Sequence, residues 1–242
     1  MPDSLHVALL DASLGDTHVQ RNFTRELAAR LSIVRVSEGD MPQPWPDANA
    51  PRTAWPYDAL IVSGSQSSVY DDRPWIAHVE QYVRRALAAH APVLGVCWGH
   101  QLLAQALGGT VHSQSRYELG YVTVEQIADD PIWKDVPHSF TVFATHSDAV
   151  TRLPENATLL ARNNAGVQAF RHGSAVGVQF HPEYDRRCAQ DMIERKSLPD
   201  AEKQTALQTI TDANVQAARA PKQLLGNFLR MAQAKRPASR NA

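Results

Sequence analysis

The segment from Pro92 to Gln101 constrains the fold of this chain more than any other. A short apolar run ends at Cys97, and a helical pattern over residues 98–107 begins at the next residue and closes at Gly108-Gly109. Gly95-Val96-Cys97-Trp98-Gly99 matches the nucleophile elbow, a sharp strand-to-helix turn in which small residues flank the nucleophile. Such a turn would place the Cys97 sulfur at a helix N-terminus, where the helix dipole favours the thiolate.

A structural cysteine is the alternative interpretation of Cys97. A lone Cys after an apolar run is usually a small, buried hydrophobic residue. The two flanking glycines and the immediate start of a helix favour the catalytic interpretation, so the two interpretations have about equal weight from this segment alone. The rest of the chain has to decide between them.

Composition excludes several classes of protein. The chain has 242 residues, enough for one large domain or two small ones, and its formal net charge is -1. We therefore expect no nucleic-acid-binding surface and no membrane contact, and no apolar run reaches transmembrane length. The first residues lack the form of a signal peptide, and the two cysteines form no Cys-x-x-Cys pair. We expect a cytoplasmic protein without disulfides, metal or cofactor.

Apolar runs and helical patterns alternate through the first half of the chain. We expect an open, mostly parallel sheet with helices on both faces, because repeated strand–helix–strand units fold in this way. Residues 41–56 are rich in Pro and small polar residues, which indicates a loop. The expected strands are 6–10, 32–36, 59–62 and 93–97, and the expected helices are 17–31 and 74–89.

The second half is richer in strands and then becomes helical. Short β-type runs lie at 121–124, 140–145, 158–162, 167–171 and 175–180. Beyond Tyr184 the strand signals stop, and residues 232–242 are expected to fray. We divide the chain into a catalytic domain, 1–184, and a helical C-terminal extension, 185–242, that packs on the same domain.

The C-terminal extension is longer than one closing helix. We expect it to be a buttress, with a lid or a partner-docking element as the alternative hypothesis, and we assign Cys188 a packing role. Residues expected to pack on the body are Ile193, Leu198, Leu207 and Ile210, with Leu224, Leu225, Phe228 and Leu229 as the apolar face of a last helix.

A second chemical signal is Gln179-Phe180-His181-Pro182-Glu183. His181 and Glu183 stand two residues apart at a strand end, so both side chains are expected on one face. A carboxylate beside an imidazole can orient it as a base for a nucleophile. A surface turn is the alternative, and a zinc deaminase is rejected because its Pro-Cys-x-x-Cys partner is absent.

A third signal is the loop Ser63-Gly64-Ser65, which follows one expected strand and precedes a helix. Such a loop can present backbone N–H groups to an oxyanion, although an ordinary connection is the simpler interpretation of this segment alone. Cys97 and His181 also lie at expected strand ends, and open α/β sheets place their active sites at the carboxyl ends of strands.

Together these motifs resemble the class I (triad) glutamine amidotransferases, over roughly residues 5 to 184. The resemblance rests on Gly95 to Gln101, on Gln179 to Glu183, on the Ser63 loop and on Thr145-His146-Ser147-Asp148. It is nearest to stand-alone proteins similar to the amidotransferase domain of GMP synthase, which include the cytosolic γ-glutamyl peptidases. That nearer likeness rests on Ser63-Gly64-Ser65 and on segments 70–75 and 117–121. The fold it implies is a flavodoxin-like α/β sheet.

The resemblance implies a role for each residue of the catalytic machinery. Cys97 would attack a γ-glutamyl carbonyl and form a thioester. His181 would take the thiol proton and return it to the leaving ammonia, and Glu183 would orient His181. The backbone N–H groups of Gly64 and Trp98 would form the oxyanion hole. This set agrees with acyl-transfer chemistry, which needs a thiolate, a base and oxyanion donors.

The implied substrate-binding residues are Gln101, Ser65 and His146. Two departures from the family pattern bear on this pocket. Gly64-Ser65-Gln66 replaces the Gly-Gly-Pro of many relatives, which suggests a less constrained oxyanion loop. Ser147 replaces the glycine of the family's His-Gly-Asp segment, so its side chain could crowd the glutamine pocket.

Three functions follow from the resemblance. The first is hydrolysis of glutamine, with ammonia passed to a separate synthase or acceptor subunit. The second is a self-contained hydrolase of γ-glutamyl peptides or conjugates. The third is a non-catalytic scaffold or regulator with the same fold, because fold alone does not determine function. Oligomers are compatible with all three.

Overall fold

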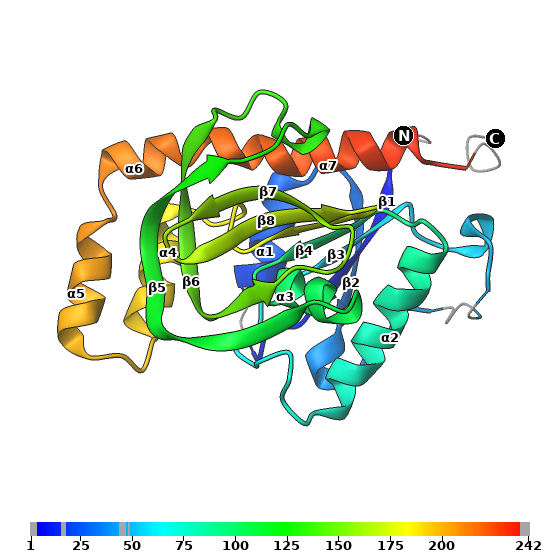
Figure 1. The fold of residues 1–242 in the computed structure, drawn as a ribbon, viewed down its shortest axis with the longest axis horizontal. Helices are drawn as coiled ribbons and strands as arrows, with labels where there is room; N and C mark the ends of the chain where they lie inside the picture. The colour runs from blue at the N-terminus through cyan, green and yellow to red at the C-terminus, as the bar shows by residue number, and fades with distance from the viewer. Residues whose placement is uncertain (1–3, 16–17, 44–46, 48, 238–242) are drawn as a thin grey trace.

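The computed structural model describes residues 4–15, 18–43, 47 and 49–237. It contains one nine-stranded sheet with the strand order β2-β1-β3-β4-β9-β8-β7-β5-β6 (Figure 1). The five strands β2, β1, β3, β4 and β9 run parallel, and the remaining pairs are antiparallel. The strands are β1 (His6–Asp11), β2 (Arg30–Arg35), β3 (Ala59–Val62), β4 (Val93–Val96), β5 (Thr110–Gln126), β6 (Ser139–Arg152), β7 (Thr158–Asn163), β8 (Gly166–His172) and β9 (Ala175–Val178). The expected mixed α/β sheet is thereby confirmed.

Alternation along β1 divides the core between the two faces of the sheet. Val7 and Leu9 pack in one apolar cluster, with residues of α1 (His18–Glu26) and α7 (Gln223–Ala234). Ala8 and Leu10 pack in another, with α2 (Pro74–Ala88) and α3 (Trp98–Ala106). Helices therefore cover both faces, as a parallel sheet with two apolar sides requires.

The C-terminal helices follow two paths across the molecule. Helices α4 (Arg186–Glu194) and α5 (Asp200–Gln208) pack on the β5–β6 ribbon through a third apolar cluster that includes Phe143 and Ile193. Helix α6 (Asp212–Ala217) leads to α7, which runs along the sheet (Figure 1). The side chains expected on the apolar face of α7 are buried: Leu224, Leu225, Phe228 and Leu229.

Several expected boundaries were wrong, and neighbouring structure explains why. The helix expected over 17–31 ends at Glu26, because residues from Arg30 onward pair with β1 and form β2. Residue 17 lies outside the described residues, as do 44–46 and 48 of the expected loop and 238–242 of the expected tail. The rest of that loop contains a short 3-10 turn, Arg52–Ala54. The last strand ends at Val178 rather than at residue 180.

Strand β5 shows what the sequence pattern missed. The pattern marked only 121–124, yet β5 begins at Thr110 and β6 continues to Arg152. Residues 112–116 are polar and exposed, so they carry no apolar alternation. Thr110 to Ser113 pair with β6, and the pairing resumes at Glu118 after a shift in register. His146 and Asp148 lie within β6, beyond the expected strand at 140–145.

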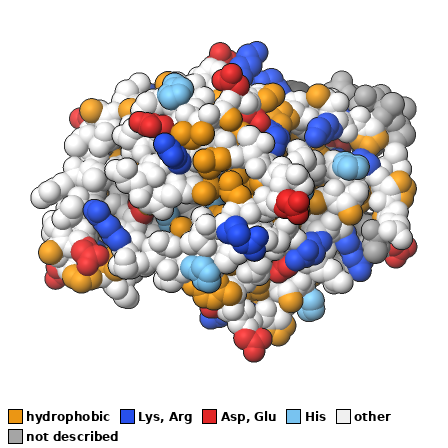
Figure 2. All heavy atoms as spheres, in the orientation of Figure 1, with side chains coloured by type: hydrophobic (Ala, Val, Ile, Leu, Met, Phe, Trp, Pro, Cys, Tyr) orange, Lys and Arg blue, Asp and Glu red, His pale blue; other side chains and the backbone are white. Residues whose placement is uncertain are grey.

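The face of the molecule drawn in Figure 2 is mixed in charge. Acidic and basic side chains are interspersed over the face drawn in Figure 2, and no field of one sign covers it. Within the described part of the chain, no helix is both long enough and apolar enough to span a bilayer.

Candidate active site

Cys97 occupies a strained turn between β4 and α3. Its backbone has φ 53° and ψ -103°, a conformation that residues with a side chain rarely adopt. A Cβ on Gly95 would lie 2.3 Å from the carbonyl oxygen of Gly99, and one on Gly99 would lie 2.2 Å from that of Val62. Both flanking positions therefore require glycine, as the elbow pattern predicts. Strain of this kind persists where the surrounding structure imposes it, often at active sites.

Three parallel strands bring Cys97, His181 and Gly64 together. The Cys97 amide donates to the Val178 carbonyl (2.8 Å), and the His181 amide donates to the Phe143 carbonyl on β6 (2.9 Å). A Cβ on Gly64 would lie 2.9 Å from Cε1 of His181 and 3.7 Å from Cβ of Cys97. The three residues follow the carboxyl ends of β3, β4 and β9, where open α/β sheets bind their ligands.

Glu183 is positioned to hold the His181 ring. Its Oε1 lies 2.8 Å from Nδ1 of His181, and both side chains are almost completely buried. Burial alone would lower the pKa of His181, but the Glu183 carboxylate and the Cys97 sulfur outweigh it and raise this pKa to about 10. The arrangement favours an imidazolium next to the Cys97 sulfur, which in turn stabilises a thiolate.

The loop that contains Gly64 is tied at several points. Ser63 Oγ accepts a hydrogen bond from the Ala12 amide (2.9 Å), and the side chain of Gln66 accepts one from Leu14 (2.7 Å). Further along the loop, the Ser68 and Tyr70 hydroxyls donate to the Asp148 carboxylate (2.6 and 3.1 Å). These side-chain bonds constrain the loop in the absence of a Gly-Gly-Pro sequence. The neighbouring Trp98 amide is the first of α3 and lies one residue from Cys97.

A small pocket of about 30 Å³ opens onto the Cys97 sulfur. Its lining contains Cys97, His181, Gly64 and Ser65. The other lining residues are Ser13, Val19, Gln66, Thr145, Tyr184, Met192 and Lys196.

Two of the expected substrate-binding residues lie elsewhere. Gln101 is buried, and its amide donates to the Asp148 carbonyl (2.8 Å) and to the Gln179 side chain (3.2 Å). His146 bridges the Glu118 carboxylate (2.8 Å) and the Asp148 carbonyl (3.0 Å). Neither residue is among the pocket lining, and neither is Ser147, whose hydroxyl faces the Asp148 carboxylate.

A larger cavity of about 540 Å³ lies beside this pocket. It is lined by residues of the β5 ribbon and the β7–β8 turn, among them Tyr117, Glu118 and His146. The Tyr117 hydroxyl is 3.2 Å from Oγ1 of Thr145, which lines the pocket at Cys97. Tyr117 therefore stands between the two spaces. In the larger cavity, burial raises the pKa of Glu118, but His146 and two side-chain amides outweigh it and lower that pKa.

Sequence reasoning missed several pocket residues. Ser13 follows the carboxyl end of β1, so the rule for open sheets could have found it. Tyr184 lies next to the His-Pro-Glu motif, and it stacks on His181 with ring centroids 4.2 Å apart. Met192 lies in α4 and Lys196 follows it, and no local sequence pattern predicted that either residue lines the pocket.

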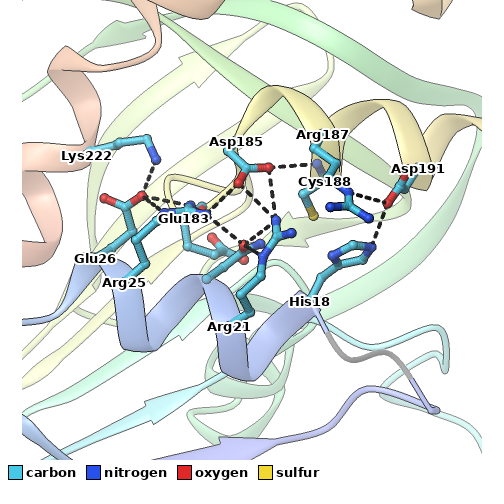
Figure 3. Close-up of polar contacts among 11 residues, drawn as sticks. His18, Arg21, Arg25, Glu26, Glu183, Asp185, Arg187, Cys188, Asp191 and Lys222 are labelled. Atoms are coloured by element: carbon cyan, nitrogen blue, oxygen red, sulfur yellow. Dashed lines mark hydrogen bonds and ion pairs between the residues drawn. The ribbon is translucent and has the colours of Figure 1, made fainter.

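The segment behind Glu183 is anchored to α1. In Figure 3 the side chains of α1 point toward α4 and toward the residues just before it. Arg25 donates to the Glu183 carbonyl (2.7 Å) and pairs with Asp185 (2.5 Å), and Arg21 pairs with the same carboxylate (2.9 Å). His18 lies 3.2 Å from Asp191 on α4. The contacts fix the chain just after His181.

The fold is an open α/β sheet, and its cysteine stands at a glycine-flanked elbow next to a buried His–Glu pair. This combination is typical of α/β proteins that transfer acyl groups through a thiol nucleophile. The model of the family described as "Glutamine amidotransferase class-I" matches residues 8–199, most of the chain. The chain belongs to the class I glutamine amidotransferase family, so the resemblance seen in the sequence is confirmed.

Relatives in the family carry two kinds of activity in their names. The chain is 41% identical to the glutamine-hydrolyzing GMP synthase of Thermomicrobium roseum, over 51% of this chain and 23% of the synthase. It is 34% identical to a γ-glutamyl-L-1-hydroxyisopropylamide hydrolase of Pseudomonas sp, over 52% of this chain and 47% of the hydrolase. The chain thus matches less than half the length of either relative.

Solved structures agree on the fold. The crystal structure of a glutamine amidotransferase from Thermotoga maritima superposes with a TM-score of 0.73, covering 95% of this chain and 98% of that one. The identity of 23% makes this a likeness of fold alone. The superposition extends over the C-terminal helices, because it covers nearly the whole chain.

Proposed function

We propose that this chain hydrolyses the γ-amide of glutamine through a thioester on Cys97. The observation that carries the proposal is the convergence of a strained Cys97, at φ 53°, with His181 and its buried Glu183 partner. A nucleophile, a base and a group that orients the base are the elements that covalent acyl transfer requires. Membership of the family supplies the γ-glutamyl carbonyl as the target.

The proposed reaction has two halves. The Cys97 thiolate attacks the γ-carbonyl carbon, and the amide N–H groups of Gly64 and Trp98 stabilise the resulting oxyanion. The carbon–nitrogen bond then breaks, and the His181 imidazolium gives its proton to the leaving ammonia. His181, now neutral, takes a proton from water, and the hydroxide attacks the thioester. The carbon–sulfur bond then breaks, and glutamate leaves with its carboxylic proton passing to solvent. The Cys97 thiolate and the His181 imidazolium are restored.

We assign the released ammonia to a separate acceptor enzyme. The likeness to a glutamine-hydrolyzing GMP synthase supports this assignment, because that name joins glutamine hydrolysis to a synthase reaction. In this proposal Ser65 contacts substrate directly, since it lines the pocket. Gln101 and His146 act through the Asp148 carbonyl that both contact.

A second candidate is a self-contained hydrolase of γ-glutamyl conjugates. The cavity of about 540 Å³ beyond Tyr117 favours it, because such a space could receive an amine larger than ammonia. The Pseudomonas relative is itself named for hydrolysis of a γ-glutamyl alkylamide. The two candidates share the residues at Cys97 and differ in what leaves from the carbonyl.

The test uses the purified chain with glutamine, γ-glutamyl dipeptides and γ-glutamyl alkylamides, each with and without candidate acceptor enzymes. We expect trapped protein to carry a γ-glutamyl group on Cys97, and Cys97→Ala to abolish turnover while remaining folded. Cys188→Ala is the matched control, because this buried thiol lies outside the pocket.

Acceptor-dependent ammonia release supports the first candidate, and rapid hydrolysis of conjugates without a partner supports the second. Turnover retained in Cys97→Ala would contradict the mechanism. If the protein is folded but Cys97 does not react with a glutamine-analogue affinity label, the result would support a non-catalytic scaffold instead.

A further inference from the structure

Lys196 gives the catalytic pocket a positive charge that comes from the C-terminal helices. Among the described residues that line this pocket, it is the sole Lys or Arg, and none is Asp or Glu. Lys196 is partly buried and follows the end of α4 at Glu194. The pocket is therefore suited to a negatively charged part of a ligand, placed near the Cys97 sulfur.

The packing of α4 sets the position of Lys196. Met192, four residues earlier, lines the same pocket, so residues 192 and 196 face it together. Ile193 and Cys188 are fully buried against the β5–β6 ribbon, and the Lys196 amide donates to the Ile193 carbonyl (3.2 Å). The backbone of Lys196 is thus anchored while its long side chain can adjust to a ligand.

The ammonium lies on the Tyr117 side of the pocket. Nζ of Lys196 is 5.2 Å from the centroid of the Tyr117 ring, within the range of a cation–π contact. Tyr117 also lines the larger cavity, and its hydroxyl contacts Thr145 in the pocket wall. Lys196 consequently stands where the catalytic pocket adjoins the space for a larger leaving group.

We propose that Lys196 is a specificity-determining residue that binds a carboxylate of the γ-glutamyl substrate. The inference rests on the proposed function, because it presumes that the substrate carries a γ-glutamyl group. Every γ-glutamyl amide has an α-carboxylate, and γ-glutamyl amino acids have a second carboxylate on the leaving amine. An ammonium pairs with either, and the partly enclosed pocket strengthens such a pair relative to one in water.

Kinetics of Lys196→Gln test the proposal and identify the carboxylate. The matched control is Arg195→Gln, which removes the same charge from an exposed neighbour outside the pocket. Lys196→Arg should keep most of the binding because it keeps the charge. With γ-glutamylisopropylamide and γ-glutamylglycine as substrates, we expect Lys196→Gln to raise KM about tenfold or more, with a smaller change in kcat.

An equal rise for both substrates would assign Lys196 to the α-carboxylate. A rise for γ-glutamylglycine alone would assign it to the carboxylate of the leaving amino acid. A KM unchanged for both substrates, or changed equally by Arg195→Gln, would overturn the proposal.

A chemical probe separates this inference from the proposed function. Iodoacetate is anionic and iodoacetamide is neutral, and both alkylate a thiolate. Peptide mapping follows the alkylation of Cys97 by each reagent. We expect the rate with iodoacetate, divided by the rate with iodoacetamide, to fall several-fold in Lys196→Gln and to stay constant in Arg195→Gln. A ratio unmoved by Lys196→Gln would show that this charge does not act in the pocket, whether or not the chain hydrolyses γ-glutamyl amides.

Discussion

Tyr184 stacks on the imidazole of His181, with ring centroids 4.2 Å apart and ring planes 27° apart. Tyr184 in turn stacks on Phe143, at 5.5 Å and 29°. The His181 ring is therefore held from two directions, by the Glu183 carboxylate at Nδ1 and by an aromatic face. We infer that Tyr184 is a positioning residue for the proposed base.

Replacement of Tyr184 tests this role. An aromatic pair contributes about 1 kcal/mol beyond its buried area, which corresponds to about fivefold in rate if it is lost only in the transition state. We expect Tyr184→Leu to lower kcat by about that factor or more, and Tyr184→Phe to retain most activity because the ring remains. Steady-state kinetics on any substrate of the wild type measure this, and equal losses in both variants would contradict a role for the ring.

Glu183→Gln should change the ionisation of His181. The Glu183 carboxylate helps to raise the pKa of His181 to about 10, so its neutral replacement lowers that pKa. A His pKa raised by folding contributes stability that is complete below about pH 6.5 and is lost as pH rises through about 10. The free energy of unfolding should thus fall between these pH values in the wild type, and less steeply in Glu183→Gln.

Two measurements check the Glu183 prediction. Denaturant unfolding from pH 6.5 to 10 gives the two slopes, and ring ¹⁵N shifts give the ionisation of His181, assigned with His181→Asn. We also expect kcat to fall by about 100-fold or more, because the base loses its orienting charge. Identical titration of His181 in the two proteins would refute the assigned coupling.

Gly64→Ala should displace the His181 ring. A Cβ at this position would lie 2.9 Å from Cε1 of His181, closer than real side chains approach. Because small misplacements of a catalytic group can cost about 100-fold in rate, we expect a loss of that order with the fold retained. The matched control is Gly226→Ala in α7, where the nearest atoms are flexible side-chain ends at 3.4 and 3.7 Å.

The control itself carries an expectation. Alanine is favoured over glycine within a helix by about 0.5–1 kcal/mol, so Gly226→Ala should raise the unfolding free energy and leave kcat unchanged. Circular dichroism and thermal melts of both variants separate a local clash from unfolding. Full activity in Gly64→Ala would show that the loop yields and that the close approach has no catalytic consequence.

The turn at Cys97 and the contact between His181 and Glu183 could be predicted from local sequence, because each lies in a short motif whose geometry is local. The glycines of the elbow are required by backbone contacts within a few residues and across one strand. The parallel half of the sheet was predictable for a similar reason, since each buried strand is a continuous apolar run. Apolar runs of this kind do not indicate which strands pair, so the order of the later strands could not be predicted from them.

Met192 and Lys196 show where sequence reasoning stops. Their place in the pocket depends on the docking of α4 against β5 and β6, which joins residues far apart in the chain. The exposed start of β5 was missed because pairing, not apolar alternation, makes it a strand. The family pattern gave His146 and Gln101 as substrate-binding residues, and this stays a prediction. The sequence did not show that both side chains contact the Asp148 carbonyl.

Asp185 couples the proposed active site to α4, and its replacement tests that coupling. Its carboxylate caps α4 by accepting from the Cys188 amide (2.7 Å), and it pairs with Arg21 and Arg25 on α1. Burial raises the pKa of Asp185, but the Cys188 amide and the two guanidinium groups outweigh it and lower that pKa. The stability from this group is therefore present above about pH 4 and is lost as pH falls through the lowered pKa.

Asp185→Ala should lower the free energy of unfolding at pH 7 by about 1 kcal/mol, the usual value of a helix cap. Asp185→Asn keeps a cap and loses the charge, and it should cost less because partly exposed ion pairs contribute little. Both differences from the wild type should shrink below pH 4. Helix α4 carries Met192 and leads to Lys196, and both residues line the pocket. Asp185→Ala should therefore also raise KM more than Asp185→Asn does. Equal KM values for the two variants would show that the helix cap does not influence the pocket.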